Sequence, residues 1–241
     1  MMMLLKIFLT VFLVQVIAFH SLANETASEQ IKAAVKVASK PKKLLHSNAV
    51  VLFANSGESV VVSDNPRWVI KGQLFDMWSN VEVNGTAQLE ALERKLPLDK
   101  LNVNTKDVFD FIVNPSKSQT VTIFIDPFEE NTSHVVSVLS KYATDYRLRF
   151  ILTAVEASHI NPFIALQCAH QKVNDAVILD QLITQNFSDA KASCDQTKAM
   201  NSYGLSAFLQ IKTSPTLVAP NSELSVGMPS QLMTWLAKNS N

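Results

Sequence analysis

The first half of the chain alternates short apolar runs with turn residues, as a small β-rich unit does. Apolar runs at 49–53 and 59–62 flank Asn55-Ser56-Gly57, which has the turn chemistry of an antiparallel hairpin. Further runs at 68–70 and 74–78 predict two more strands. A single small sheet buries little surface, and its exposed edge can pair with a copy of itself. The pattern therefore predicts an N-terminal β-rich unit that forms a homodimer.

Helical periodicity replaces the strand pattern at Thr86, where leucines recur every three or four positions among charged residues until Pro97. A second amphipathic stretch runs from Thr105 to Ile112. Two short helices followed by polar residues are typical of a connection between domains. We interpret residues 85–117 as a helical linker.

The next region has the pattern of a strand, a helix and a parallel strand. Val121 to Ile125 is a nearly continuous apolar run, as expected for a strand covered on both faces. Thr132 or Ser133 can cap a helix through Lys141, and a second apolar run follows at 148–155. The order predicts a βαβ unit.

The last third adds helices and a hairpin. Helical patterns cover 161–185 and 198–209, a hairpin is predicted within 216–226, and Ser230 can cap a final helix to Lys238. The sum of βαβ, a helical insert and ββα is the thioredoxin arrangement.

The predicted fold class is therefore α+β. We expect an N-terminal β-rich dimerisation domain at 24–84, the helical linker, and a thioredoxin-like α/β domain with a helical insert at 118–241. An additional short amphipathic helix is predicted from Glu29 to Lys40, before Pro41.

The first 23 residues predict export. Lys6 precedes an apolar run that is short for a transmembrane helix, and Ser21-Leu22-Ala23 has the small residues that signal peptidase accepts. We expect a signal peptide at 1–23, cleaved after Ala23, and no stable membrane insertion afterwards. The alternative is an uncleaved N-terminal anchor.

Composition and charge argue against some classes of function. The chain is 47% hydrophobic and 17% charged, which suits a folded protein with a real core. Its 21 basic and 21 acidic residues cancel, so the electrostatic footprint of a nucleic-acid binder is missing. With only five glycines it shows no phosphate-binding loop, and we expect no cofactor.

The two cysteines predict one structural disulfide, Cys168–Cys194, because an exported chain reaches an oxidising compartment. Their wide spacing is neither a CxxC redox motif nor half of a zinc site with close ligands.

Several motifs occur in the order of one known family. They are the hairpin at 51–57, the segment 70–78, the strand at 121–126 running into Pro127, the segment Ala192-Ser193-Cys194-Asp195, and Thr213-Ser214-Pro215. In these motifs the chain resembles the periplasmic disulfide isomerases of the DsbC/DsbG type, in particular DsbC-like proteins of conjugative transfer and type IV secretion systems. The resemblance implies the periplasm, a homodimer through the N-terminal domain, and Cys168–Cys194 as the family's structural disulfide.

The resemblance fails at the redox motif. The family has Cys-x-x-Cys where this chain has Glu129-Glu130-Asn131-Thr132, so Glu129 replaces the nucleophilic thiol and Thr132 the resolving thiol. Disulfide exchange requires an attacking thiolate, and neither residue can supply one. We therefore predict no catalytic residue and no isomerase activity. The resemblance implies that Thr213, Ser214 and Pro215 form a cis-proline loop that can bind peptide.

Three functions remain in view. The first is a non-catalytic chaperone or assembly factor that binds partly folded exported or secretion-apparatus proteins. The second is a thiol-disulfide isomerase that uses Cys168 and Cys194 themselves. The third is a dedicated part of a conjugation machine that binds one partner.

Two groups of residues have competing interpretations. Glu129 and Glu130 could act with His134 as acid/base groups or metal ligands, but solvated carboxylates near a helix N-terminus are the expectation, and we predict no metal site. A set of large apolar residues could capture unfolded chains, but we expect them in the core: Trp68, Phe75, Met77 and Trp78.

Overall fold

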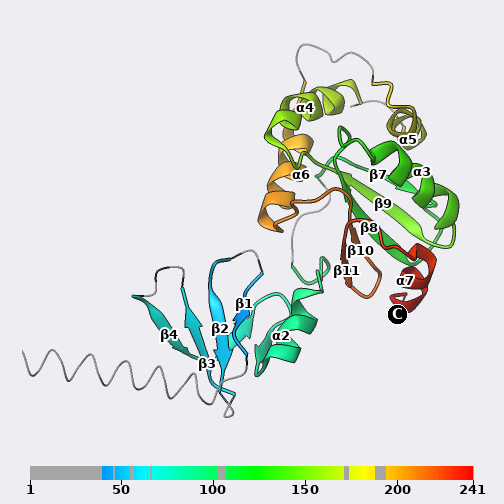
Figure 1. Cartoon of the computed structure of the whole chain (residues 1–241). Helices are drawn as coiled ribbons and strands as arrows, with labels where there is room; N and C mark the ends of the chain where they lie inside the picture. The colour runs from blue at the N-terminus through cyan, green and yellow to red at the C-terminus, as the bar shows by residue number, and fades with distance from the viewer. Residues whose placement is uncertain are drawn as a thin grey trace, which may run out of the picture. The chain divides into compact units, whose positions relative to one another are not determined.

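The structure is a computed structural model of the chain. It describes residues 40–45, 47–54, 57–63, 65, 67–101, 107–170, 174–187 and 194–240. The predicted signal peptide and nearly all of the predicted helix at 29–40 lie outside these ranges. The chain divides into two compact units, with the boundary between Ala91 and Leu92 (Figure 1).

The first unit is built on an antiparallel sheet of four strands in the order β1-β2-β3-β4. These strands are β1 (Lys42–Lys43), β2 (Val50–Phe53), β3 (Ser59–Val62) and β4 (Val69–Gly72). A two-stranded sheet of β5 (Leu74–Asp76) and β6 (Val81–Val83) follows, and then α2 (Thr86–Glu93). The predicted hairpin is confirmed: β2 pairs antiparallel with β3, and Gly57 has the positive φ of 85° that glycine adopts readily.

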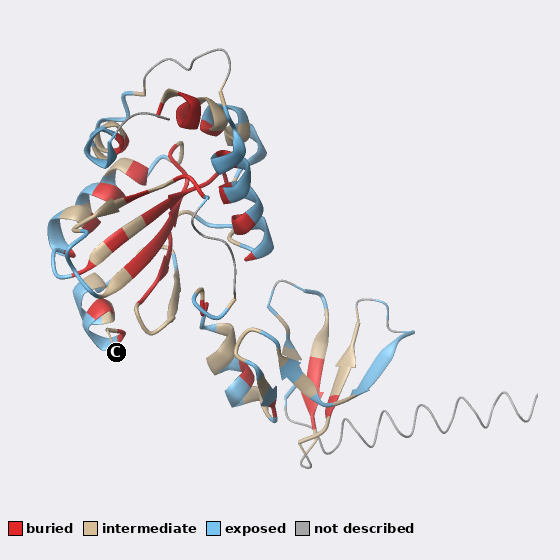
Figure 2. Ribbon diagram, turned by 180° about the vertical axis from the view of Figure 1, so that it is seen from behind, coloured by how far each residue is buried: buried red, intermediate tan, exposed pale blue. Residues whose placement is uncertain are grey.

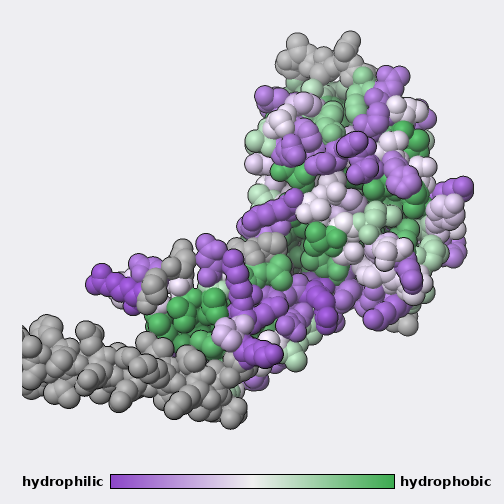
Figure 3. Space-filling view, viewed as in Figure 1, coloured by the Kyte–Doolittle hydropathy of each residue, from purple (hydrophilic) through white to green (hydrophobic). Residues whose placement is uncertain are grey.

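Of the four apolar residues expected in the core, Trp68, Phe75 and Met77 are exposed and Trp78 is half-buried, so that prediction is wrong. Trp68 is 61% exposed, Ile70 69% and Met77 81%, and Phe75 is also exposed. Figure 3 shows apolar side chains gathered on the surface over β3 and β4. The core of this unit comes instead from β2, β6 and α2, which bury Leu52, Val83 and Leu89.

The second unit contains a five-stranded sheet in the order β11-β10-β8-β9-β7. Its strands are β7 (Asp110–Val113), β8 (Thr120–Ile125), β9 (Arg147–Leu152), β10 (Thr216–Val218) and β11 (Leu224–Val226). Strands β8 and β9 are parallel, and the other pairs are antiparallel.

Helices cover both faces of this sheet. They are α3 (Thr132–Tyr142), α4 (Ile160–Ala169), α5 (Asp175–Thr184), α6 (Thr197–Phe208) and α7 (Leu232–Lys238), with a 3₁₀ turn, η1 (Ala157–His159), before α4. Figure 1 shows α4 and α6 on one side of the sheet and α3 and α7 on the other. Strand order and connections are those of the thioredoxin fold, with α4 and α5 as an insert, so the protein is α+β.

The sheet is the centre of the hydrophobic core (Figure 2). Every residue from Val121 to Ile125 is buried, because helices cover both faces of β8. Phe111 of β7 stacks on Phe150 of β9, with ring centroids 4.7 Å apart. The continuous apolar run read from the sequence is therefore a central strand.

The prediction of a second helix in the linker is wrong. Residues Asp110–Val113 form β7, which pairs antiparallel with β9 at the edge of the sheet. Val108, Phe109 and Phe111 are all buried against the second unit, so this stretch belongs to that unit rather than to a linker. Pairing with β9 outweighs the local helical periodicity.

Both predicted helix caps also need correction. Helix α3 begins after Asn131, whose side chain makes no capping hydrogen bond, and Thr132 and Ser133 lie inside the helix. Helix α7 begins after Gln231 rather than Ser230. Within the described ranges, no helix is both long and apolar enough to cross a membrane.

Candidate functional site

A turn between β8 and α3 lies against the loop that carries Pro215. The Ser214–Pro215 peptide bond is cis. The backbone N–H of Asp126, the residue after β8, donates to Ser214 Oγ at 2.9 Å. Pro215 is buried, and its carbonyl accepts from the N–H of Gly227 at 2.8 Å. The loop and the turn therefore form one structural region, although they are 88 positions apart in sequence.

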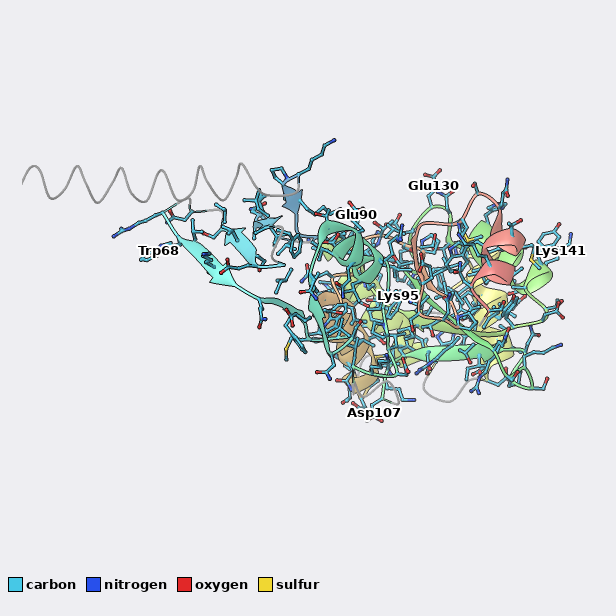
Figure 4. The ribbon with its side chains drawn as sticks, turned by 90° about the horizontal axis from the view of Figure 1, so that it is seen from below. Trp68, Glu90, Lys95, Asp107, Glu130 and Lys141 are labelled. Carbon is cyan, nitrogen blue, oxygen red and sulfur yellow. A yellow bond between two sulfur atoms is a disulfide. The ribbon has the colours of Figure 1, made fainter. Side chains whose placement is uncertain are left out.

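The four residues of the turn, Glu129 to Thr132, differ in burial. Glu129 is half-buried, while Glu130 and Asn131 are exposed. Figure 4 shows Glu130 with its carboxylate pointing outward. Thr132 is buried and its hydroxyl donates to the carbonyl of Asp126 at 2.5 Å. The turn therefore presents carboxylates to solvent and a threonine hydroxyl that is occupied in holding the turn closed.

Asp126 is the buried acidic group of this region. It is 0% exposed, and its carboxylate accepts hydrogen bonds from the backbone N–H of Phe128 at 3.0 Å and of Val155 at 2.8 Å. Nδ1 of His159 lies 2.9 Å from Asp126 Oδ2. A buried carboxylate requires such partners because burial penalises an unpaired charge.

His159 is held in a strongly acidic setting. The hydrogen bond with Asp126 raises the pKa of His159 above its usual value, and the negative charges of Asp126, Glu156 and Glu129 act in the same direction against the lowering effect of burial. The ring is 21% exposed. Asp126 and His159 therefore form an ion pair when His159 is protonated. The pair lies at the edge of the sheet where the parallel strands β8 and β9 end.

Three potential ligand atoms converge here, one each from Asp126, Glu129 and His159, and all lie within 4.8 Å of one another. Local spacing in the sequence instead groups Glu129 with Glu130 and His134. Those two side chains are exposed and are not members of this cluster.

The sequence did contain a signal for this cluster. Asp126 directly follows β8, and His159 lies shortly after β9. The carboxyl ends of adjacent parallel strands meet at the same edge of a sheet, and that edge is where α/β folds gather functional side chains.

The predicted disulfide is present. Cys168, in α4, is bonded to Cys194 with a Cα–Cα distance of 5.4 Å. Cys168 is buried, and neither cysteine lies in the turn after β8. Since the sequence holds two cysteines, the chain has no free thiol while this bond is intact.

Comparison with known proteins finds partial similarity to solved structures. No family model matches the sequence, and no curated protein matches it. One similar structure is a disulfide interchange protein from Neisseria gonorrhoeae, with a TM-score of 0.46 and 19% identity over 56% of this chain and 96% of that chain. Another is DsbG of Helicobacter pylori, with a TM-score of 0.33 and 14% identity over 76% of this chain and 92% of that chain. The five-stranded mixed sheet with helices on both faces defines the class of the chain as α+β.

Proposed function

We propose that this chain is an exported, periplasmic DsbC-like protein that works without thiol chemistry. It acts as a homodimeric chaperone or assembly factor for partly folded exported proteins or secretion-apparatus subunits. The observation that carries the proposal is the turn between β8 and α3. This turn lies against the loop of Pro215, but it contains Glu129 and Thr132 at the two positions where the resemblance implies cysteines.

None of the residues in the turn between β8 and α3 can perform the thiol step of disulfide exchange. Exchange begins when a thiolate attacks a disulfide sulfur and forms a mixed disulfide. Glu129 cannot form that bond, and the Thr132 hydroxyl is buried in its contact with Asp126. The remaining candidates, Cys168 and Cys194, are joined 26 positions apart, unlike the close pairs of catalytic disulfides.

The cis-proline loop supports binding of an extended polypeptide. Thr213 is exposed and Ser214 is half-buried. Within the described part of the chain, the backbone N–H and C=O of Ser214 make no hydrogen bond. An extended client can pair with such free backbone groups as an added strand does, and main-chain pairing is tolerant of client sequence.

Strand β4 supports the homodimer. Among the described residues it pairs with β3 alone, and Val69 and Ile70 within it and Trp68 just before it are exposed. The opposite edge of the same sheet, β1, consists of Lys42 and Lys43, and lysines are a common protection against edge pairing. Pairing of β4 with β4 of a second copy would extend the sheet through backbone hydrogen bonds and place the apolar side chains of the two strands side by side.

Light scattering during aggregation of a chemically unfolded client tests the proposal on the full mature chain. We expect suppression by the natural protein and loss of both dimer and suppression in Ile70→Lys, which places a charge on the apolar edge. Lys43→Glu, a change of charge on the opposite edge, is the matched control and should behave as the natural protein. A natural chain that is monomeric and leaves aggregation unchanged would contradict the general chaperone role.

A pull-down from periplasmic extract separates two forms of the proposal. Many captured unfolded proteins indicate a general chaperone. Capture of a single secretion-system subunit, with no effect on the model client, indicates a dedicated assembly factor.

A further inference from the structure

The cluster after the two parallel strands has the composition of a metal site. Asp126 comes from the end of β8, Glu129 from the turn before α3, and His159 from η1 after β9. We propose that these three side chains bind a divalent transition-metal cation, with Zn²⁺ as the preferred ion. The proposal departs from the expectation of no metal site and does not depend on the chaperone function.

The ligand atoms of the cluster lie close to the separations of a metal site. Nδ1 of His159 and Oδ2 of Asp126 are 2.9 Å apart. Zinc bonds to imidazole nitrogen and carboxylate oxygen are about 2.0 to 2.2 Å long, and tetrahedral geometry places two such ligand atoms about 3.4 Å apart, so this pair need open by only about 0.5 Å to admit the ion. The whole set lies within 4.8 Å, and Glu129, half-buried on a turn, can close the remaining distance by rotating its side chain.

Two of the ligands are held in place before any ion binds. The backbone N–H groups of Phe128 and Val155 fix the Asp126 carboxylate, one on each oxygen. His159 belongs to η1, whose turn is closed by a 3.0 Å hydrogen bond from its own N–H to the carbonyl of Glu156. Outer hydrogen bonds that orient the ligands are a regular feature of metal sites and raise affinity by limiting the reorganisation on binding.

The charge balance of the cluster favours a cation. Three carboxylates act on the imidazole of His159, from Asp126, Glu129 and Glu156. Among the described residues, no lysine or arginine forms an ion pair with any of the three. The three carboxylates therefore outnumber the single positive charge of a protonated His159, and a divalent ion in place of the shared proton would balance the two ligand carboxylates, Asp126 and Glu129.

The ligand types select the class of ion. One imidazole nitrogen with two carboxylate oxygens suits zinc, cobalt, nickel or copper, whereas Mg²⁺ and Ca²⁺ bind through oxygen alone. Three protein ligands leave a coordination position for water. This position lies beside the turn where the related fold would hold its thiols.

Competition with a chromogenic zinc chelator tests the site on the full mature chain without an affinity tag, with ZnCl₂ as the only added metal. We expect one Zn²⁺ per chain. Glu129→Gln and His159→Ala should each weaken binding at least tenfold, since each removes one of three ligands. Glu130→Gln and His134→Ala, which change exposed neighbours of the same chemical kind, are the matched controls and should leave the affinity unchanged.

Cobalt gives a second readout. Co²⁺ added to the natural chain should produce visible absorption bands of a low-symmetry site, and these should disappear in Glu129→Gln. Circular dichroism of each variant verifies folding. Absence of zinc binding by the natural chain would overturn the proposal, as would zinc binding that Glu129→Gln and His159→Ala leave intact.

Discussion

Removal of the Cys168–Cys194 disulfide should destabilise the second unit by about 3.5 kcal/mol at 25 °C. The bond joins residues 26 positions apart. In the chain-entropy model, opening a loop of that size returns about 12 cal/mol/K to the unfolded chain, which gives this free energy. Because Cys168 is buried, substitution by alanine adds a packing loss of about 1 kcal/mol.

Urea unfolding of the Cys168→Ala/Cys194→Ala variant measures the effect. The two units can unfold separately, so a probe confined to the second unit is needed. Replacement of Trp68 and Trp78 by phenylalanine leaves Trp235, which packs against the second unit's core, as the only tryptophan. The natural chain with the bond reduced by dithiothreitol is the control that separates loop closure from packing.

The free energy of unfolding of the second unit should be about 3.5 kcal/mol lower in the reduced chain than in the oxidised chain. The alanine variant should be slightly less stable than the reduced chain. A difference under about 1 kcal/mol between oxidised and reduced chains would refute the loop-closure argument.

Two further predictions concern the core and the buried ion pair. Leu139→Ala, at a position with 0% exposure in α3, should destabilise the second unit by about 2 to 5 kcal/mol in the same urea assay, and a loss under about 1 kcal/mol would contradict the core described above. Because Asp126 raises the pKa of His159 in the folded protein, the pair's stabilisation is fully present below the ordinary pKa of 6.5 and disappears as pH rises through the folded value. With a chelator present, the stability advantage of the natural chain over His159→Gln should therefore shrink from pH 6 towards pH 9, and an advantage that grows with pH would contradict the direction of the shift.

The central strands were predictable because burial on both faces leaves a simple pattern. Val121 to Ile125 is a continuous apolar run, and the structure makes it β8, paired on both sides. The disulfide was predictable for a different reason: two cysteines in a chain predicted to be exported permit one pairing.

The errors come from contacts that are distant in sequence. Phe109 and Phe111 have a helical spacing with their neighbours, but their partners lie on α6 and β9: the N–H of Phe109 donates to Ser202 Oγ, and Phe111 stacks on Phe150. Trp68 and Ile70 are apolar in a strand, which indicates core residues in most small sheets. Their position on an edge strand is visible only once strand order is known.

The candidate site was half predictable. The turn at Glu129 to Thr132 follows from the resemblance, whereas the contact of Asp126 with His159 spans 33 positions and depends on the parallel register of β8 and β9. The local spacing of Glu129, Glu130 and His134 pointed to the wrong histidine, because His134 lies on the exposed face of α3.

Insulin reduction and refolding of a scrambled disulfide substrate, measured on the mature chain beside a Glu129→Cys/Thr132→Cys variant, test the central claim most directly. The account predicts that the natural chain is inactive and that the variant gains activity, because the variant supplies two thiols in a turn that the Asp126–Ser214 hydrogen bond already holds against the loop of Pro215. Activity of the natural chain would contradict the account and would make Cys168 and Cys194 the redox pair.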